Sequence, residues 1–314
     1  MFRWQPTADI EALRNRAHLY KILRQFFESR GVLEVETPIL GKATTEDPFI
    51  ESFSTRSREQ ARYLQTSPEF FLKRLLASGS GDIYSLSKVF RKEETGTWHH
   101  FEFTMLEWYR VGWDEHKLMD EVAELIHLLL PDIKKEKISY RELFLQYLGV
   151  DPHHIELEEL RSLVLLRIEL SVDTKALNAD VLLDLLMTHC IEPELPEHLL
   201  FVYDYPENKA ALSELGANKQ GQTVARRFET YLKRVELANG YLELTDAEEQ
   251  RQRVEKNLMY RKQNGFSKVP HDEALIAAME YGLPKCAGVA MGIDRLLMLT
   301  TNTNTIQETI SFAE

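Results

Sequence analysis

The chain has 314 residues, of which 44% are hydrophobic and 28% are charged, and its formal net charge is −12. This composition is typical of a folded globular protein and excludes a disordered or collagen-like chain. No apolar run approaches the ~20 residues of a membrane span, and the acidic charge disfavours a large nucleic-acid footprint.

The first part of the chain predicts a long helix followed by short strands. Apolar residues recur at helical spacing from Asp9 to Arg30, and Gly31 stands where a glycine commonly ends a helix. Pro68 is suited to the first turn of a second helix. In chain order we expect a helix over 9–30, strands over 32–35 and 63–66, a helix over 68–77, strands over 83–90 and 101–111, and a helix over 114–130.

The second part of the chain begins with a leucine-rich segment, 139–195, that we expect to be a mostly helical insertion without chemistry of its own. After it we expect a strand over 199–205, two strands within 225–244, helices over 246–264 and 272–281, a strand over 285–292 and a final helix over 293–299. The strands come in runs rather than alternating with helices. This order favours an α+β fold with a mainly antiparallel sheet flanked by helices, not a Rossmann fold.

Arginine and glutamate residues stand where two of these strands meet. The segment Phe90-Arg91-Lys92-Glu93-Glu94 leaves one strand, and a returning strand carries Phe103, Met105, Glu107 and Tyr109 at alternate positions. Because side chains two apart on a strand share a face, an aromatic ring and a carboxylate would lie on one surface near an arginine. A surface hairpin with an aromatic core face is the simpler alternative.

Three glutamates, Glu229, Glu236 and Glu243, are spaced seven residues apart. Residues seven apart on one strand face opposite ways, but a turn between two antiparallel strands could bring two of these carboxylates together. Clustered carboxylates repel one another, so such a pair is typical of a Mg²⁺ site or of a site for a cationic ligand. Three solvated glutamates on a sheet are the alternative.

Small residues alternate in Gly288-Val289-Ala290-Met291-Gly292, and Arg295 follows at the start of the final helix. Small side chains allow a ligand to approach the backbone closely, and an arginine can meet a phosphate. The segment lacks the Gly-Lys-Ser/Thr of a P-loop. Close packing of the strand is the alternative explanation.

In order and spacing, these segments resemble the signature motifs of class II aminoacyl-tRNA synthetases, and most closely the catalytic domain of lysyl-tRNA synthetase. The matching stretches are 27–40 (motif 1), 66–69, 90–107 (motif 2), 236–240 and 288–295 (motif 3). The resemblance covers nearly the whole chain from its start, so we expect a single domain over residues 1–314 without an anticodon-binding domain. That expectation and the acidic charge favour a stand-alone relative, the elongation factor P β-lysine ligase family.

The resemblance implies a role for each matching residue. Arg91 and Arg295 would be catalytic, with Arg91 on the α-phosphate of ATP and Arg295 on its γ-phosphate. The other implied ATP-binding residues are Glu93, His99, Phe103, Glu229, Glu236 and Gly292, of which Glu229 and Glu236 would hold Mg²⁺. The implied amino-acid-binding residues are Glu69, Glu107, Tyr109, Asn239, Glu243 and Ala290.

Two positions depart from the lysyl-tRNA synthetase pattern. In motif 2, Phe101 replaces the usual proline, so either His99 or His100 would face the phosphates. In motif 3, Ala290 replaces the middle glycine. One added methyl group matters in a close-packed site, and we interpret Ala290 as an element of substrate selectivity.

The resemblance implies an ATP-dependent ligase that activates (R)-β-lysine as an adenylate and transfers it to a lysine ε-amino group of elongation factor P. We also expect a homodimer in the cytoplasm, where Cys190 and Cys286 stay reduced. Two alternatives stay open. One is a truncated synthetase-like enzyme that acylates tRNA or another amine, and the other is a regulatory binding protein without catalysis.

Overall fold

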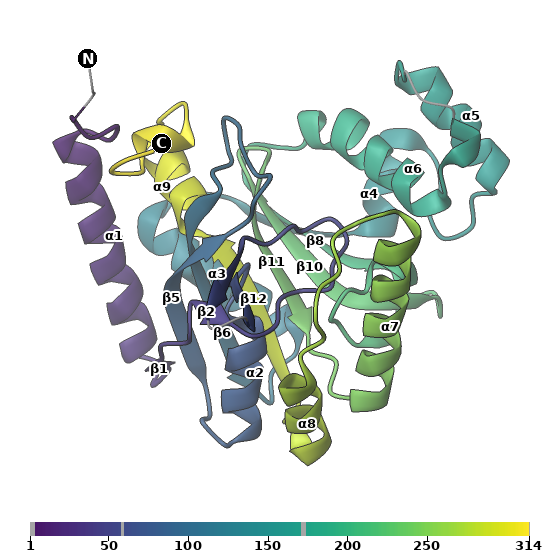
Figure 1. Ribbon diagram of the computed structural model, residues 1–314. Helices are drawn as coiled ribbons and strands as arrows, with labels where there is room; N and C mark the ends of the chain where they lie inside the picture. The colour runs from purple at the N-terminus through teal and green to yellow at the C-terminus, as the bar shows by residue number, and fades with distance from the viewer. Residues whose placement is uncertain (1–3, 58–59, 171–173, 314) are drawn as a thin grey trace. The chain divides into compact units, whose positions relative to one another are not determined.

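The computed structural model describes residues 4–57, 60–170 and 174–313 of the chain. Its elements gather into two units. Unit 1 consists of Met1–Asp114 and Glu243–Glu314, and unit 2 consists of Glu115–Leu242 (Figure 1). Unit 1 is therefore assembled from two stretches of chain that the whole of unit 2 separates in the sequence.

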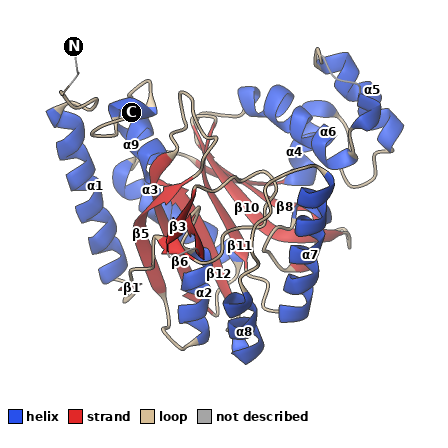
Figure 2. Cartoon of the chain, viewed as in Figure 1, coloured by secondary structure: helices blue, strands red, loops and turns tan. Residues whose placement is uncertain are grey.

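Unit 1 combines helices with strands (Figure 2). Its helices are α1 (Ile10–Glu28), α2 (Glu69–Ala77), α7 (Ala247–Gln263), α8 (Glu273–Gly282) and α9 (Ile293–Thr301), followed by a 3₁₀ turn at Ile306–Glu308. Its strands are β1 (Leu33–Glu34), β2 (Leu40–Gly41), β3 (Ser54–Ser57), β4 (Gln60–Leu64), β5 (Ile83–Phe90), β6 (Glu102–Val111) and β12 (Cys286–Gly292).

The strands of unit 1 pair mainly antiparallel. β6 lies between β5 and β12 and is antiparallel to both, while β1 joins the other edge of β5 in parallel. β2, β4 and β3 form a small antiparallel sheet of their own. The register across β6 places Ser85 and Ala290 directly opposite Glu107, one on each side. Because directly opposed residues project to the same face, these three side chains share one surface.

Helix α1 is defined by its cap and its apolar face, as the sequence predicts. The side chain of Asp9 accepts a hydrogen bond from the Ala12 N–H, which satisfies one of the free donors at the helix start. Leu23 and Phe27 are fully buried. Gly31 follows the helix with a φ of +67°, a left-handed conformation that glycine adopts without steric cost.

The segment around α1 is bonded to the last residues of the chain. Arg16 forms an ion pair with the buried Asp294 of α9, and its Nη2 also donates to the Thr309 carbonyl at 2.7 Å. The backbone N–H of Thr7 donates to the Ser311 carbonyl at 2.9 Å. These bonds join parts of unit 1 that lie almost three hundred residues apart in the sequence.

Unit 2 carries the leucine-rich segment beside its own strands. Its helices are α3 (Glu115–Leu129), α4 (Tyr140–Leu148), α5 (Leu157–Arg167) and α6 (Ala179–Leu186), and α6 continues through a π-helical turn at Met187–Ile191. Its strands are β7 (Lys135–Ser139), β8 (Leu199–Pro206), β9 (Leu215–Ala217), β10 (Thr223–Leu232) and β11 (Val235–Leu242). β7 is parallel to β8, and the pairs β8–β10, β9–β10 and β10–β11 are antiparallel.

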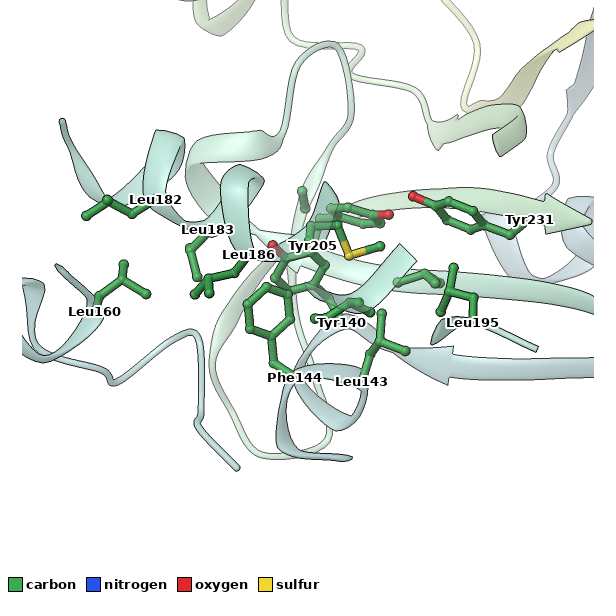
Figure 3. Packing of buried hydrophobic residues seen from close by; sticks show 14 of the residues in the cluster. Tyr140, Leu143, Phe144, Leu160, Leu182, Leu183, Leu186, Leu195, Tyr205 and Tyr231 are labelled. Carbon is green, nitrogen blue, oxygen red and sulfur yellow. The ribbon is translucent and has the colours of Figure 1, made fainter. Parts of the chain in front are cut away.

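The core of unit 2 mixes leucines with aromatic rings (Figure 3). On α4, Tyr140 and Phe144 stack with ring centroids 4.5 Å apart. Tyr205 of β8 packs against Tyr140 at 4.8 Å, while the leucines of α6 complete the cluster. The helices of 139–195 thus share a hydrophobic core with strands of the same unit.

Most predicted elements are confirmed, and β5 has the predicted bounds. The α+β class, the mainly antiparallel pairing and the helical character of 139–195 are confirmed as well. Sequence reasoning missed β2, β3, β7 and β9, which have two to five residues each and are too short to show a period. None of the helices in the described residues is long and apolar enough to cross a membrane.

Candidate active site

Four of the predicted amino-acid-binding residues lie together in unit 1. Glu69 opens α2, Glu107 and Tyr109 lie two residues apart on β6, and Glu243 bonds through its backbone N–H to the Cys286 carbonyl of β12. Glu107, Tyr109 and Glu243 are each at most 3% exposed. We call Glu69, Glu107, Tyr109 and Glu243, together with Lys73, the amine pocket.

Lys73 is the member of the amine pocket that sequence reasoning missed. Its Nζ lies 2.7 Å from Glu69 Oε1 and 2.7 Å from Glu243 Oε2, and its side chain is 2% exposed. Burial lowers the pKa of Lys73, but the Glu243 and Glu69 carboxylates outweigh this, so the pKa is raised and the ammonium stays charged. The available signal was the i, i+4 spacing of Glu69 and Lys73 on a predicted helix.

Glu107 is held by two hydroxyl donors. Ser67 Oγ donates to Glu107 Oε2 and the Tyr109 hydroxyl donates to Glu107 Oε1, both at 2.7 Å. Burial, followed by the negative charge of Glu69, nevertheless raises the pKa of Glu107 to about 8. Burial also raises the pKa of Glu243 to about 7, against the opposing effect of Lys73. These raised pKa values are typical of a site that favours a cationic ligand.

The backbone of β12 forms one wall of the amine pocket. A Cβ atom at Gly288 would lie 2.4 Å from Glu243 Oε1 and 2.4 Å from Tyr109 Cε1, so only glycine fits there. Ala290, two residues along the same face, stands opposite Glu107 and is partly accessible. The small-residue alternation read from the sequence therefore corresponds to a close approach of buried carboxylates to the strand.

The predicted phosphate-binding residues of motif 2 also lie in unit 1. The Arg91 guanidinium sits over the Phe103 ring at 5.3 Å, and its Nη1 donates to Glu94 Oε1 at 3.0 Å. Its Nε–H is buried and has no hydrogen-bond acceptor among the described residues. An unsatisfied buried donor on a cation favours an anionic ligand. Glu93, next to this pair, is exposed.

Motif 3 meets motif 2 at His99. Arg295, in the first turn of α9 after Gly292, donates from Nε to the Trp98 carbonyl at 3.1 Å, and its Nη2 lies 2.6 Å from His99 Nε2. Burial, and then the positive charge of Arg295, lowers the pKa of His99, so the neutral ring can accept this hydrogen bond. Arg91 lowers the pKa of His99 further.

His100 faces elsewhere. Its Nδ1 lies 2.8 Å from the Glu102 carbonyl oxygen and its ring stacks on Phe101 at 4.3 Å. Of the two histidines that the sequence left open, His99 is the one in contact with a predicted phosphate-binding arginine. Phe101, which replaces the family's proline, thus holds the other histidine by stacking.

Glu229, Glu236 and Asn239 lie in unit 2, on the hairpin β10–β11. Glu229 pairs with Asn239, and Glu236 pairs with Tyr231 across a register shift between Thr230 and Tyr231. Since Glu229 and Tyr231 are two apart on β10, this register places both carboxylates on one face of the hairpin. The two glutamates therefore share a face of the hairpin, and this depends on an irregularity that spacing alone does not reveal.

The Glu229 carboxylate is well supplied with donors. The hydroxyls of Tyr205 and Tyr231 each donate to its Oε2 at 2.7 Å, and Arg227 donates to its Oε1. A carboxylate offers about four acceptor positions, so one position remains. Within the described residues, no group of three or more His, Cys, Asp or Glu could hold a metal. Mg²⁺ commonly takes one or two carboxylates together with substrate phosphates and water, and this pair fits that requirement.

Strand β6 links the two halves of the site within unit 1. Phe103 and Glu107 are four residues apart on one face, which corresponds to about 13 Å along a strand. One end of this face presents cationic and aromatic groups suited to a nucleotide, and the other end presents buried carboxylates suited to ammonium groups. The arrangement can hold an anion and a cation of one reaction at a fixed separation.

Comparison with known proteins agrees with this arrangement. A family model described as tRNA synthetases class II (D, K and N) matches residues 6–314. A protein of Pseudoalteromonas translucida named elongation factor P–(R)-beta-lysine ligase is 46% identical over 316 residues, covering 98% of this chain and 97% of that protein.

Proteins with the same name in two further organisms are similar to the same extent. That of Vibrio vulnificus is 46% identical over 317 residues and that of Proteus mirabilis is 44% identical over 318 residues. Each alignment covers 98% of this chain and 97% of the relative. The similarity therefore extends over both units.

Proposed function

The chain belongs to the class II tRNA synthetase family, and from this premise we propose that it is an ATP-dependent ligase that activates (R)-β-lysine and transfers it to elongation factor P. The acceptor would be the ε-amino group of one lysine of that protein. The observation that carries the proposal is the amine pocket at one end of β6. Its three carboxylates, Glu69, Glu107 and Glu243, are buried or nearly buried and are suited to bind ammonium groups.

The activation step needs no general base. A carboxylate oxygen of the amino acid attacks the α-phosphorus of ATP, the bond to the β-phosphate oxygen breaks, and pyrophosphate leaves with the electron pair. Arg91 would neutralise charge at the α-phosphate, while Arg295 would bind the γ-phosphate. Catalysis then depends on position and on charge stabilisation, as in other phosphate chemistry without covalent participation of the protein.

In the transfer step, a neutral lysine amine of the acceptor attacks the carbonyl carbon of the adenylate. AMP leaves with the electron pair of the broken carbon–oxygen bond, and the amine gives up a proton as the amide forms. Elongation factor P enters the proposal through the names of the relatives. Bulk water accepts this proton.

Two assays test the proposal in sequence. We expect ATP–pyrophosphate exchange that depends on (R)-β-lysine, followed by transfer of radiolabelled β-lysine to purified elongation factor P and not to total tRNA. Label on tRNA would instead support a truncated synthetase-like enzyme. Absence of exchange with any amino acid would support a regulatory binding protein.

We propose that Glu229 and Glu236 would hold Mg²⁺, which would supply positive charge to the phosphates of ATP when bound. Glu236→Gln removes a carboxylate charge on the shared face, so we expect the Mg²⁺ concentration for half-maximal exchange to rise about tenfold, with partial recovery at high Mg²⁺. Titration of Mg²⁺ in the exchange assay measures this, and Glu207→Gln, an exposed glutamate of unit 2, is the matched control. A loss of activity that Mg²⁺ does not alter would assign Glu236 to amine binding instead.

The resemblance to motif 1 also implies a homodimer, and the surface of that segment supports the prediction. Leu33 of β1, Ile39 and Leu40 of β2 are exposed at 56%, 44% and 44%. We expect a twofold dimer that buries more than the ~1,200 Å² of a small stable interface. Light scattering at micromolar concentration measures the mass, and a monomer under those conditions would contradict the prediction.

A further inference from the structure

The amine pocket contains a cation of its own, Lys73, in addition to the carboxylates that would bind the ammonium groups of the substrate. Three carboxylates, Glu69, Glu107 and Glu243, contribute three negative charges when ionised, and the Lys73 ammonium bridges two of them. The formal sum is two negative charges in a pocket whose groups are almost entirely buried. Because an uncompensated buried charge is costly, this sum decides how many cationic groups a ligand must bring.

We propose that Lys73 sets the net charge of the amine pocket at minus two and thereby selects an amino acid with two ammonium groups. This inference rests on the proposed function, because it concerns the substrate of the same site. It makes Lys73 a specificity-determining residue that need not touch the substrate. The Lys73 ammonium neutralises the charge of one carboxylate and leaves two. A ligand with one ammonium would therefore leave one buried negative charge without a partner.

Two further titratable groups beside Lys73, Tyr109 and Cys286, do not alter the count. The titratable groups that face the pocket from each neighbouring element are Glu69 (α2), Glu107 and Tyr109 (β6), Glu243 (after β11), Cys286 (β12) and, beyond Glu69, Glu46. Burial raises the pKa values of Tyr109 and Cys286, so both stay neutral near pH 7. Burial raises the pKa of Glu46 to about 7, against the backbone hydrogen bonds at its own position and at Asp272. Glu46 is therefore partly ionised near pH 7, and it lies beyond Glu69, outside the five residues that define the pocket.

The raised pKa values give this charge balance a measurable pH dependence. Near pH 7 the pocket without ligand holds protons on Glu107, whose pKa is about 8, and partly on Glu243, whose pKa is about 7. Two ligand ammonium groups favour the ionised carboxylates and expel these protons. Binding must therefore strengthen as pH rises through the pKa values of the free pocket.

Removal of the Lys73 charge should shift the pH dependence of ligand binding to higher pH. In Lys73→Met, Glu243 loses the cation at 2.7 Å, and the loss of so close a partner raises a carboxyl pKa by about 1–3 units. We expect the rising limb of kcat/KM against pH, measured by exchange with β-lysine, to shift upward by about that amount. Lys73→Arg keeps the charge and should restore the wild-type midpoint.

Selectivity provides the second readout. In Lys73→Met the pocket loses one positive charge, and protonation of Glu243 offsets only part of this loss. The preference for β-lysine over an analogue with a methyl group in place of its terminal ammonium should therefore rise, by up to about tenfold. Lys134→Met, which removes an exposed lysine paired with Glu136, is the matched control and should change neither readout. Lower activity with an unchanged pH midpoint and an unchanged preference would overturn the proposal.

The test separates this inference from the proposed function. Wild-type exchange with β-lysine tests the function, whereas the comparison of variants and the number of protons released on binding test the charge of the pocket. If Lys73→Met does not fold, or if exchange is absent, the proposal is tested by calorimetric titration of the wild-type protein. Titration in two buffers with different ionisation enthalpies gives the number of protons that ligand binding releases. At pH 7, β-lysine should release about one more proton than its single-ammonium analogue. Equal proton release would overturn the proposal.

Discussion

Arg91→Ala is expected to lower the rate of ATP–pyrophosphate exchange by about 10²–10³-fold. The substitution removes the cation proposed to stabilise charge at the α-phosphorus under attack, and loss of one such group typically costs ~2.7–4 kcal/mol of transition-state stabilisation. The structure supports this role, since Arg91 lies over Phe103 with a buried Nε–H that has no acceptor among the described residues. Steady-state exchange at saturating ATP measures the effect.

The control for this prediction is Arg251→Ala. Arg251 lies in α7 of unit 1 and pairs with Glu273 and Glu280 at the surface, so its removal should leave exchange near the wild-type rate. Circular dichroism of both variants separates loss of chemistry from loss of fold. If Arg91→Ala retains exchange within about threefold of wild type, its proposed role is wrong, because one lost stabilising contact of this kind costs far more.

Ala290→Gly is expected to improve the activation of α-lysine relative to β-lysine by about 10–200-fold, the range that one methylene-sized difference in a pocket provides. Ala290 stands directly opposite Glu107 on the pocket face of β12. Moving an amine from the α to the β carbon displaces an ammonium by one bond, and the carboxylates of the pocket match the lysyl-tRNA synthetase pattern. The methyl group of Ala290 is therefore the expected selector.

Measurement of kcat/KM for both isomers in wild type and variant decides this prediction, and the KM for ATP should change little. Ala287→Gly is the matched control, because Ala287 is buried on the opposite face of the same strand and its loss weakens the strand without enlarging the pocket. An unchanged isomer ratio in Ala290→Gly would show that the methyl group only fills space.

How far the sequence predicts this site differs from residue to residue. The resemblance to lysyl-tRNA synthetase implied that Glu69, Glu107, Tyr109 and Glu243 act together, and the structure places them in one pocket. Lys73 escaped prediction because a lysine on a helix is usually solvated. Its burial follows only from the packing of α2 against elements far along the chain. Long-range packing of this kind leaves no periodic signal in the sequence.

Local irregularities of the backbone also limited what the sequence could predict about the site. Spacing of seven predicted a pairing of Glu229 and Glu236, but their common face depends on the register shift at Thr230 and Tyr231. Likewise, the sequence left open whether His99 or His100 faces the phosphates. In the structure His100 stacks on Phe101 and His99 contacts Arg295, and sequence spacing does not predict such contacts. The elements themselves were predicted well wherever a period extends over eight or more residues, as in α1, β5 and α9.

The bond between Arg16 and Asp294 has a consequence for biosynthesis. The two residues are 278 positions apart, so at ~5–20 residues per second the ribosome adds the partner of Arg16 roughly 15–55 s after Arg16 itself. Unit 2 is continuous in sequence, and all of it is synthesised before Glu243, Gly288 or α9. We therefore expect unit 2 to fold first on the ribosome. A nascent chain stalled after Leu242 would then carry α1 without its final contacts, in a form that chaperones and proteases recognise.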